Sequence, residues 1–182
     1  MCFEACGVKI FGLFMNYREW LQQGSSEITG DPLWTVEADR LSWFAADVSW
    51  ADVTKRMQDK RTIDPSNQLY RAVGSMGANI SEGFSRGSGR DRARFDEYSL
   101  GSARESRTWY FNGRYVLGET VASHRRRYLT QIIRLLLVMI PDQRGAPLRE
   151  EEPAHQISDG SSLFQSSSAH SLDEWLEKIP MS

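Results

Sequence analysis

The chain has 182 residues, of which 40% are hydrophobic and 25% charged, and its formal net charge is −2. This length suits one globular domain with extensions, and no segment approaches the roughly 18 apolar residues that span a bilayer. Its two cysteines, Cys2 and Cys6, lie together near the N-terminus, which supports neither a disulfide framework nor a structural zinc site. We therefore expect a cytoplasmic protein with no membrane partner and no cofactor.

Charge is unevenly distributed along the chain. Residues 60–134 contain fourteen Lys/Arg against seven Asp/Glu, whereas residues 1–59 and 135–182 both have more acidic than basic residues. A basic middle between acidic flanks predicts a surface for acidic partners or for the chain's own acidic segments.

Residues 1–30 show no sustained hydrophobic period and include the linker-like Gly24-Ser25-Ser26, so we expect a poorly ordered N-terminal extension. Asp31-Pro32 then has the form of an N-cap followed by proline at the first helical position. One face of this first helix carries Leu33, Ala38, Leu41, Ala45, Val48 and Asp52. Aromatic residues partly off that face indicate either a wide core, the favoured reading, or an intersubunit contact; they are Trp34, Trp43, Phe44 and Trp50.

Asp64-Pro65 repeats the start signal and predicts a second helix. Its apolar residues share one face, at Leu69, Val73, Met76 and Ile80. Gly83 is expected to stop this helix through a positive φ. The helix also contains small residues that favour close packing against a neighbouring helix, namely Gly74, Ser75, Gly77 and Ala78.

Ser88 is the predicted N-cap of a third helix, with Asp91 completing a short capping box. Its inward stripe is predicted to comprise Phe95, Tyr98, Ser102, Ser106, Trp109, Gly113 and Val116. The opposite face then carries Arg90, Arg94 and Arg104 together with Leu100 and Phe111.

A fourth helix is expected from Thr120 to Ile140, where Pro141 should end it. Its stripe is Val121, Tyr128, Ile132, Leu136 and Met139, and its last two turns are apolar nearly all round, which favours burial against another subunit. Residues 142–182 are acidic and rich in serine, so we expect a mostly disordered tail. Within it, residues 171–179 could form a short helix that recruits a protein partner or docks on the bundle.

The second and third predicted helices contain a set of residues that matches the sequence pattern of a known protein family. It comprises Leu69, Arg71-Ala72, Ser75, Ala78-Asn-Ile-Ser-Glu-Gly-Phe84, Arg86-Gly-Ser88, Phe95 and Gly101-Ser-Ala-Arg-Glu105. In these residues the chain resembles the bacterial 23S rRNA intervening-sequence proteins, over about residues 31–141. The resemblance implies an all-α, antiparallel up-and-down four-helix bundle and assembly into a homopentamer. It also implies kinship with accessory proteins of diversity-generating retroelements.

Residues of this pattern are predicted to have structural roles; they are Arg71, Asn79, Glu82, Gly83, Ser88, Gly101 and Glu105. Asn79 and Glu82 are expected to form a buried polar link with Arg71, Arg86 or a neighbouring helix end that fixes helix register, with a ligand-binding or catalytic role as the less favoured alternative.

Enzyme signatures are absent from the sequence. The three histidines lack metal-ligand spacing on a helix, and Pro153 argues against a helical Glu152-x-x-His155 motif. The turn from Gly83 to Gly89 lacks the Gly-Lys-Ser/Thr of a phosphate loop. We therefore expect a protein that is not an enzyme and has no catalytic or metal-binding residues.

The arginines give the sharpest functional hypothesis. A row of them on the third helix and a cluster near the start of the fourth could contact RNA or single-stranded DNA; they are Arg86, Arg90, Arg94, Arg104, Arg125, Arg126 and Arg127. The alternative is a protein-interaction scaffold, in which the same arginines form intersubunit salt bridges and the tail recruits a partner.

Overall fold

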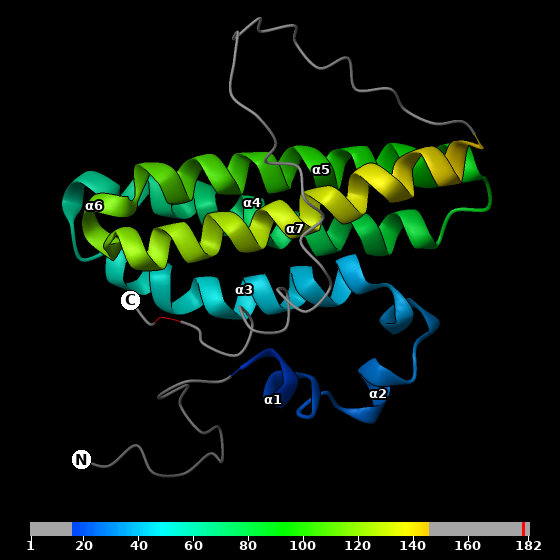
Figure 1. Ribbon diagram of the computed structural model, residues 1–182, viewed down its shortest axis with the longest axis horizontal. Coiled ribbons are helices and arrows are strands. Elements are labelled where there is room, and N and C mark those ends of the chain that lie inside the picture. Colours follow the sequence, from blue (N-terminus) through cyan, green and yellow to red (C-terminus); the bar gives the residue numbers. More distant parts are fainter. Residues whose placement is uncertain (1–15, 146–179, 181–182) are drawn as a thin grey trace, which may run out of the picture.

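The computed structural model describes residues 16–145 and Pro180, and four long helices pack side by side in it (Figure 1). These are α3 (Glu37–Arg56), α4 (Ile63–Phe84), α5 (Gly89–Asn112) and α7 (Glu119–Arg144). Short helical segments complete the described part: α1 (Tyr17–Leu21), α2 (Ser26–Thr29), η1 (Pro32–Thr35), η2 (Lys60–Thr62) and α6 (Arg114–Leu117). The predicted all-α four-helix bundle is confirmed.

The helices follow one another around the bundle. α5 packs extensively against both α4 and α7, α3 packs on α4, and a smaller α3–α7 contact closes the ring. Because each long helix is joined to the next by a short connection, neighbours run antiparallel. The boundary between α5 and α7 is therefore a long seam that ends at α6 (Figure 1).

Helix boundaries follow capping chemistry at some ends and differ from the predictions at others. Ser88 caps α5 as predicted, since its Oγ accepts from the Asp91 backbone N–H at 3.1 Å and donates to the Asp91 carboxylate at 2.7 Å. Pro141 does not end α7, which continues to Arg144 and stops at Gly145 with a φ of 72°. A proline this near the C-terminal end removes only one hydrogen bond of the ladder, so the last turn still forms.

Gly83 has a different role from the predicted one. It lies inside α4, so no positive φ stops the helix there. A Cβ atom at position 83 would lie 2.9 Å from the Cβ of Phe95 and 3.3 Å from the backbone oxygen of Arg92, both on α5. Gly83 is thus needed for the close approach of α4 and α5. Because α4 and α5 lie this close together, Ser99 also donates a hydrogen bond to the Met76 carbonyl at 3.0 Å.

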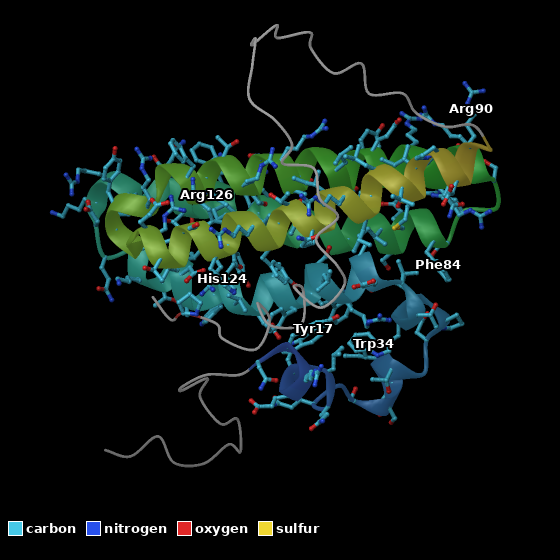
Figure 2. The ribbon with its side chains drawn as sticks, viewed as in Figure 1. Tyr17, Trp34, Phe84, Arg90, His124 and Arg126 are labelled. Atoms are coloured by element: carbon cyan, nitrogen blue, oxygen red, sulfur yellow. The ribbon has the colours of Figure 1, made fainter. Side chains whose placement is uncertain are left out.

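The segment before the bundle is more structured than predicted. Residues 16–35 carry α1, α2 and η1, although residues 1–30 were expected to be poorly ordered and Asp31-Pro32 to begin a long helix. Tyr17 and Trp20 are buried against Phe44 of α3, with ring centroids 5.1 and 5.4 Å away. Trp20 also donates from Nε1 to the Asp47 carboxylate at 2.6 Å. This aromatic packing holds the segment on α3, as the positions of Tyr17 and Trp34 in Figure 2 illustrate.

The core confirms some predicted stripes and corrects one. The predicted α4 face is buried in full, and α7 buries its predicted stripe apart from the partly exposed Met139. On α5 the buried residues are Ala93, Asp96, Ser99, Leu100, Ala103, Ser106 and Tyr110. Tyr98, predicted to face inward, is 46% exposed, and Leu100, predicted to face outward, is buried. The packed face of α5 consists mainly of small residues, which let its neighbours approach closely.

Aromatic side chains also remain on the surface of α3 and α4. Trp43, Trp50 and Tyr70 are exposed, and Trp50 packs edge-on against Tyr70 at 5.8 Å between ring centroids. Only Phe44 and Trp34 of the four aromatics assigned to the first helix contribute to the core. On α7, Val138 is exposed on the apolar last turns. Trp43 and Trp50 therefore lie outside the predicted core.

Two buried carboxyl groups make stability depend on pH. Burial raises the pKa of Asp39 and of Asp96 from 3.8 to about 6. Because each pKa is higher in the folded state, the protonated carboxyl groups favour folding. Their contribution to the free energy of unfolding is complete below about pH 4 and is lost as the pH rises to about 6. We expect Asp96→Asn to exceed the parent protein in free energy of unfolding at pH 7, by on the order of 1–2 kcal/mol.

Urea denaturation at pH 4 and pH 7 measures this difference. Most of the gain should disappear at pH 4, where the parent carboxyl group is protonated in the folded state and partly protonated in the unfolded state. An equal effect of Asp96→Asn at both pH values would contradict the prediction.

Candidate nucleic-acid interface

An open groove with three arginines lies along the seam between α5 and α7. Its volume is about 440 Å³, and its lining is Arg107, Thr108, Phe111, Ser123, Arg126, Arg127 and Thr130. Arg107 bridges the seam by donating from Nη1 to the Thr130 hydroxyl at 3.4 Å. Guanidinium groups and hydroxyl groups are the donors that contact phosphate oxygens in nucleic-acid complexes. We call this surface the arginine groove.

Arginines and aromatic rings alternate at the α6 end of the arginine groove. The Cζ of Arg114 lies 4.2 Å from the ring centroid of Tyr115 and 4.0 Å from that of Phe111. The Cζ of Arg126 lies 5.3 Å from the same Phe111 ring. These are cation–π distances. We call the series Tyr115, Arg114, Phe111 and Arg126 the arginine–aromatic ladder.

Hydrogen bonds fix the orientation of the ladder. Arg114 donates from Nη1 to the Phe111 carbonyl at 2.7 Å and from Nη2 to the Tyr115 hydroxyl at 2.6 Å. Arg126 pairs with the Glu119 carboxylate and donates to the Ala122 carbonyl at 3.3 Å. Glu119 therefore offsets part of the positive charge of Arg126, and Arg107 and Arg127 supply the rest of the basic character.

Arg125 lies in the core, contrary to its prediction as a nucleic-acid contact. Its guanidinium donates to both oxygens of Asp52, at 2.8 and 3.3 Å, and to the Pro180 carbonyl at 2.9 Å. Tyr110 donates to the same Asp52 carboxylate at 2.9 Å. Asp52 is fully buried and Arg125 nearly so. This buried pair links α3 to α7 and has a structural role.

The arginines at the start of α5 form a second, separate set. Arg86 pairs with Glu82 and lies over the Phe95 ring at 4.7 Å, while Arg94 donates from Nε to the Tyr98 hydroxyl at 2.7 Å. Arg90 and Arg126 lie toward opposite ends of the bundle (Figure 2). The 21 residues from Arg90 to Phe111 correspond to about 30 Å of helix. The predicted arginines therefore do not form one patch, and Arg104 lies on α5 between the two sets.

Residues of the family pattern act mostly within their own helices. Asn79 donates from Nδ2 to the Ser75 carbonyl at 2.7 Å, and Glu82 pairs with Arg86 rather than with another helix. The Glu105 carboxylate accepts from Trp109 Nε1 at 3.1 Å, and Arg71 is exposed. The predicted buried link is not formed, because Glu82 pairs with its predicted partner Arg86 at the surface and Asn79 bonds within its own helix. A buried ion pair between helices is formed instead by Asp52 and Arg125.

Gly101 is exposed, and within the described part of the chain a Cβ atom there would meet nothing within 4 Å. Its place in the pattern is not explained by packing inside the subunit.

Within residues 16–145 and Pro180, no group of three or more His, Cys, Asp or Glu side chains could hold a metal ion. Residues 152–155 and the predicted tail helix at 171–179 lie outside the described residues. None of the described helices is both long and apolar enough to traverse a membrane.

Comparison with known proteins gives a family and a fold. The model of the 23S rRNA-intervening sequence protein family matches residues 44–135. A crystal structure from Bacteroides thetaiotaomicron VPI-5482, described as a protein with unknown function from the S23 ribosomal protein family, is similar in fold. Its TM-score is 0.52 at 23% identity, and the match covers 57% of this chain and 97% of that one. No curated protein matches. Since the family match spans half of the chain and its fold is a helix bundle, the chain belongs to the 23S rRNA-intervening sequence protein family.

Proposed function

We propose that the protein is a non-enzymatic, oligomeric accessory factor of the cytoplasm that binds RNA or single-stranded DNA through the arginine groove. The observation that carries this proposal is the convergence of Arg107, Arg126 and Arg127 on one groove beside exposed aromatic rings. Arginine contacts phosphate through two parallel N–H groups, and nearby hydroxyls add further donors. The name of the family, which refers to a 23S rRNA sequence, supports RNA as the partner.

Self-association is part of the proposal. The exposed Trp43, Trp50 and Tyr70 on α3 and α4 form an aromatic surface away from the α5–α7 seam. Aromatic residues are enriched in protein interfaces, and the family resemblance favours a pentamer. Repetition of the arginine groove around a ring would multiply the number of phosphates contacted by one strand. The same aromatic surface supports the alternative function, a protein-interaction scaffold.

Removal of the three groove arginines tests the nucleic-acid proposal. We expect the variant with Arg107→Ala, Arg126→Ala and Arg127→Ala to bind a short single-stranded RNA at least about tenfold more weakly at low salt. The slope of log affinity against log salt should fall by about 2, since each phosphate contact on a single strand contributes about 0.7. Fluorescence anisotropy over a range of salt concentrations measures both quantities.

The matched control is the triple alanine variant at Arg86, Arg90 and Arg94, which removes the same charge from the other end of α5. We expect it to lose less affinity than the groove variant. Light scattering on the same samples gives the subunit number, which should exceed one. No binding by the parent protein at low salt, or a loss confined to the control variant, would contradict the assignment to the groove.

A further inference from the structure

We propose that the arginine–aromatic ladder makes the arginine groove selective for single strands, because an unpaired base stacks on the exposed ring of Tyr115. This inference rests on the proposed function and specifies its substrate class. The first observation is that two aromatic rings of the ladder are exposed. Tyr115 is 82% exposed and Phe111 is 46% exposed, whereas the bundle buries Phe44 and Tyr110 almost completely.

Exposure alone would not indicate a ligand, but the two rings are also held in place. Arg114 lies within 4.2 Å of both ring centroids and is fixed by its hydrogen bonds to the Tyr115 hydroxyl and the Phe111 carbonyl. A ring held in this way loses little side-chain freedom when a base stacks on it. The ladder is therefore preorganised for a planar ligand.

The ladder continues directly into the arginine groove. Phe111 and Arg126 belong to both, and Arg107 and Arg127 lie farther along the groove lining. A nucleic-acid strand with its phosphates at these arginines would bring its next bases to α6, where Tyr115 is located. Phosphate contacts and stacking surfaces thus lie in sequence along one path.

Stacking distinguishes single strands from duplexes. In a duplex the base faces are already covered by neighbouring bases, so a protein groove meets mainly phosphates and base edges. In a single strand the faces are available, and both aromatic rings and arginine planes serve as stacking partners in RNA recognition. The ladder should therefore add affinity for single strands and none for duplexes.

The experiment compares two RNA probes on the full chain at low salt. One is a short mixed-sequence RNA without self-complementarity, and the other is the duplex of that RNA with its complement. We expect Tyr115→Ala to weaken single-strand binding by about 5- to 150-fold, the effect of one lost stacked base, and to leave duplex binding unchanged. Because Tyr115 is a surface residue, folding should be unaffected, which circular dichroism verifies.

Tyr98→Ala is the matched control. Tyr98 is also an exposed aromatic residue of the basic region and lies beside Arg94, but it belongs to the other set of arginines. It should bind both probes like the parent protein. If Tyr115→Ala leaves single-strand binding unchanged, or weakens both probes equally, the stacking inference is overturned while the arginine groove stands. If the parent protein binds neither probe, the proposed function is overturned as well.

Discussion

Replacing Asp52 with alanine is expected to lower the free energy of unfolding by about 3–5 kcal/mol, a large part of the roughly 5–15 kcal/mol that stabilises a typical domain. The carboxylate of Asp52 is fully buried and accepts hydrogen bonds from Arg125 and Tyr110. Its removal leaves Arg125 in the core without its counter-ion. Urea denaturation followed by circular dichroism at 222 nm, the usual helix band, measures the change.

A second buried arginine adds to this expected loss. Arg56 is fully buried next to the Asp52–Arg125 pair, and burial lowers its pKa, while the negative charge of Asp52 acts in the opposite direction. Its Nη1 reaches the Trp109 carbonyl at 3.4 Å, whereas Nε and Nη2 have no hydrogen-bond partner among the residues that the structure describes. Without Asp52, the buried guanidinium groups of Arg56 and Arg125 would both lose the carboxylate that neutralises them.

The double variant Asp52→Ala, Arg125→Met is the control for this prediction. It removes both charges, so it should lose less stability than the sum of the two single variants. Asp64→Ala, an exposed carboxylate in the first turn of α4, should cost under about 1 kcal/mol. A loss for Asp52→Ala no larger than that for Asp64→Ala would show that the buried pair contributes little.

Gly83→Ala is expected to destabilise the bundle by about 1–3 kcal/mol, the usual cost of overpacking. The new Cβ would lie 2.9 Å from the Phe95 Cβ and 3.3 Å from the Arg92 carbonyl oxygen, and neither atom is the end of a flexible side chain. α4 and α5 would have to separate, which would also stretch the hydrogen bond from Ser99 to the Met76 carbonyl. Thermal or urea unfolding measures the loss.

The same replacement at Gly74 should have the opposite sign. Gly74 lies in the same helix, and a Cβ atom there meets none of the described residues within 4 Å. Alanine should therefore stabilise the protein by up to about 1 kcal/mol, through the higher helix propensity of alanine. Equal effects at positions 74 and 83 would show that the α4–α5 approach does not depend on Gly83.

The sequence predicted the four helices because clear breaks separate them and because α4 and α7 carry long apolar stripes. The α4 stripe of Leu69, Val73, Met76 and Ile80 is continuous, and all four residues are buried. The α5 face could not be found in the same way. Its packed surface consists largely of alanine and serine, which hydrophobic periodicity does not mark, while Phe95, Tyr98 and Trp109 suggested a different face.

The arginine cluster shows a second limit of sequence reasoning. Consecutive helical residues point about 100° apart, so Arg125, Arg126 and Arg127 cannot all face the same surface. The available signal was Asp52, a carboxylate on the otherwise apolar stripe of the first helix, which required a buried cation opposite it. Only the three-dimensional packing identifies Arg125 as that cation.

The arginine–aromatic ladder and the N-terminal packing lacked a periodic signal altogether. Arg114 and Tyr115 lie in the four-residue helix α6, and Tyr17 and Trp20 lie in the five-residue helix α1. Neither helix is long enough to show a repeat. Their positions follow from contacts with distant parts of the chain, such as Phe44 for Tyr17 and Arg126 for Phe111.

The ion pair between α3 and α7 constrains how this bundle can change during evolution. A substitution of Asp52 or Arg125 alone leaves an uncompensated charge in the interior, whereas well-packed apolar residues can replace both at once. Descendants of this chain are therefore expected to retain both residues or to exchange both, so that an alignment of close homologues would show coupled variation at positions 52 and 125.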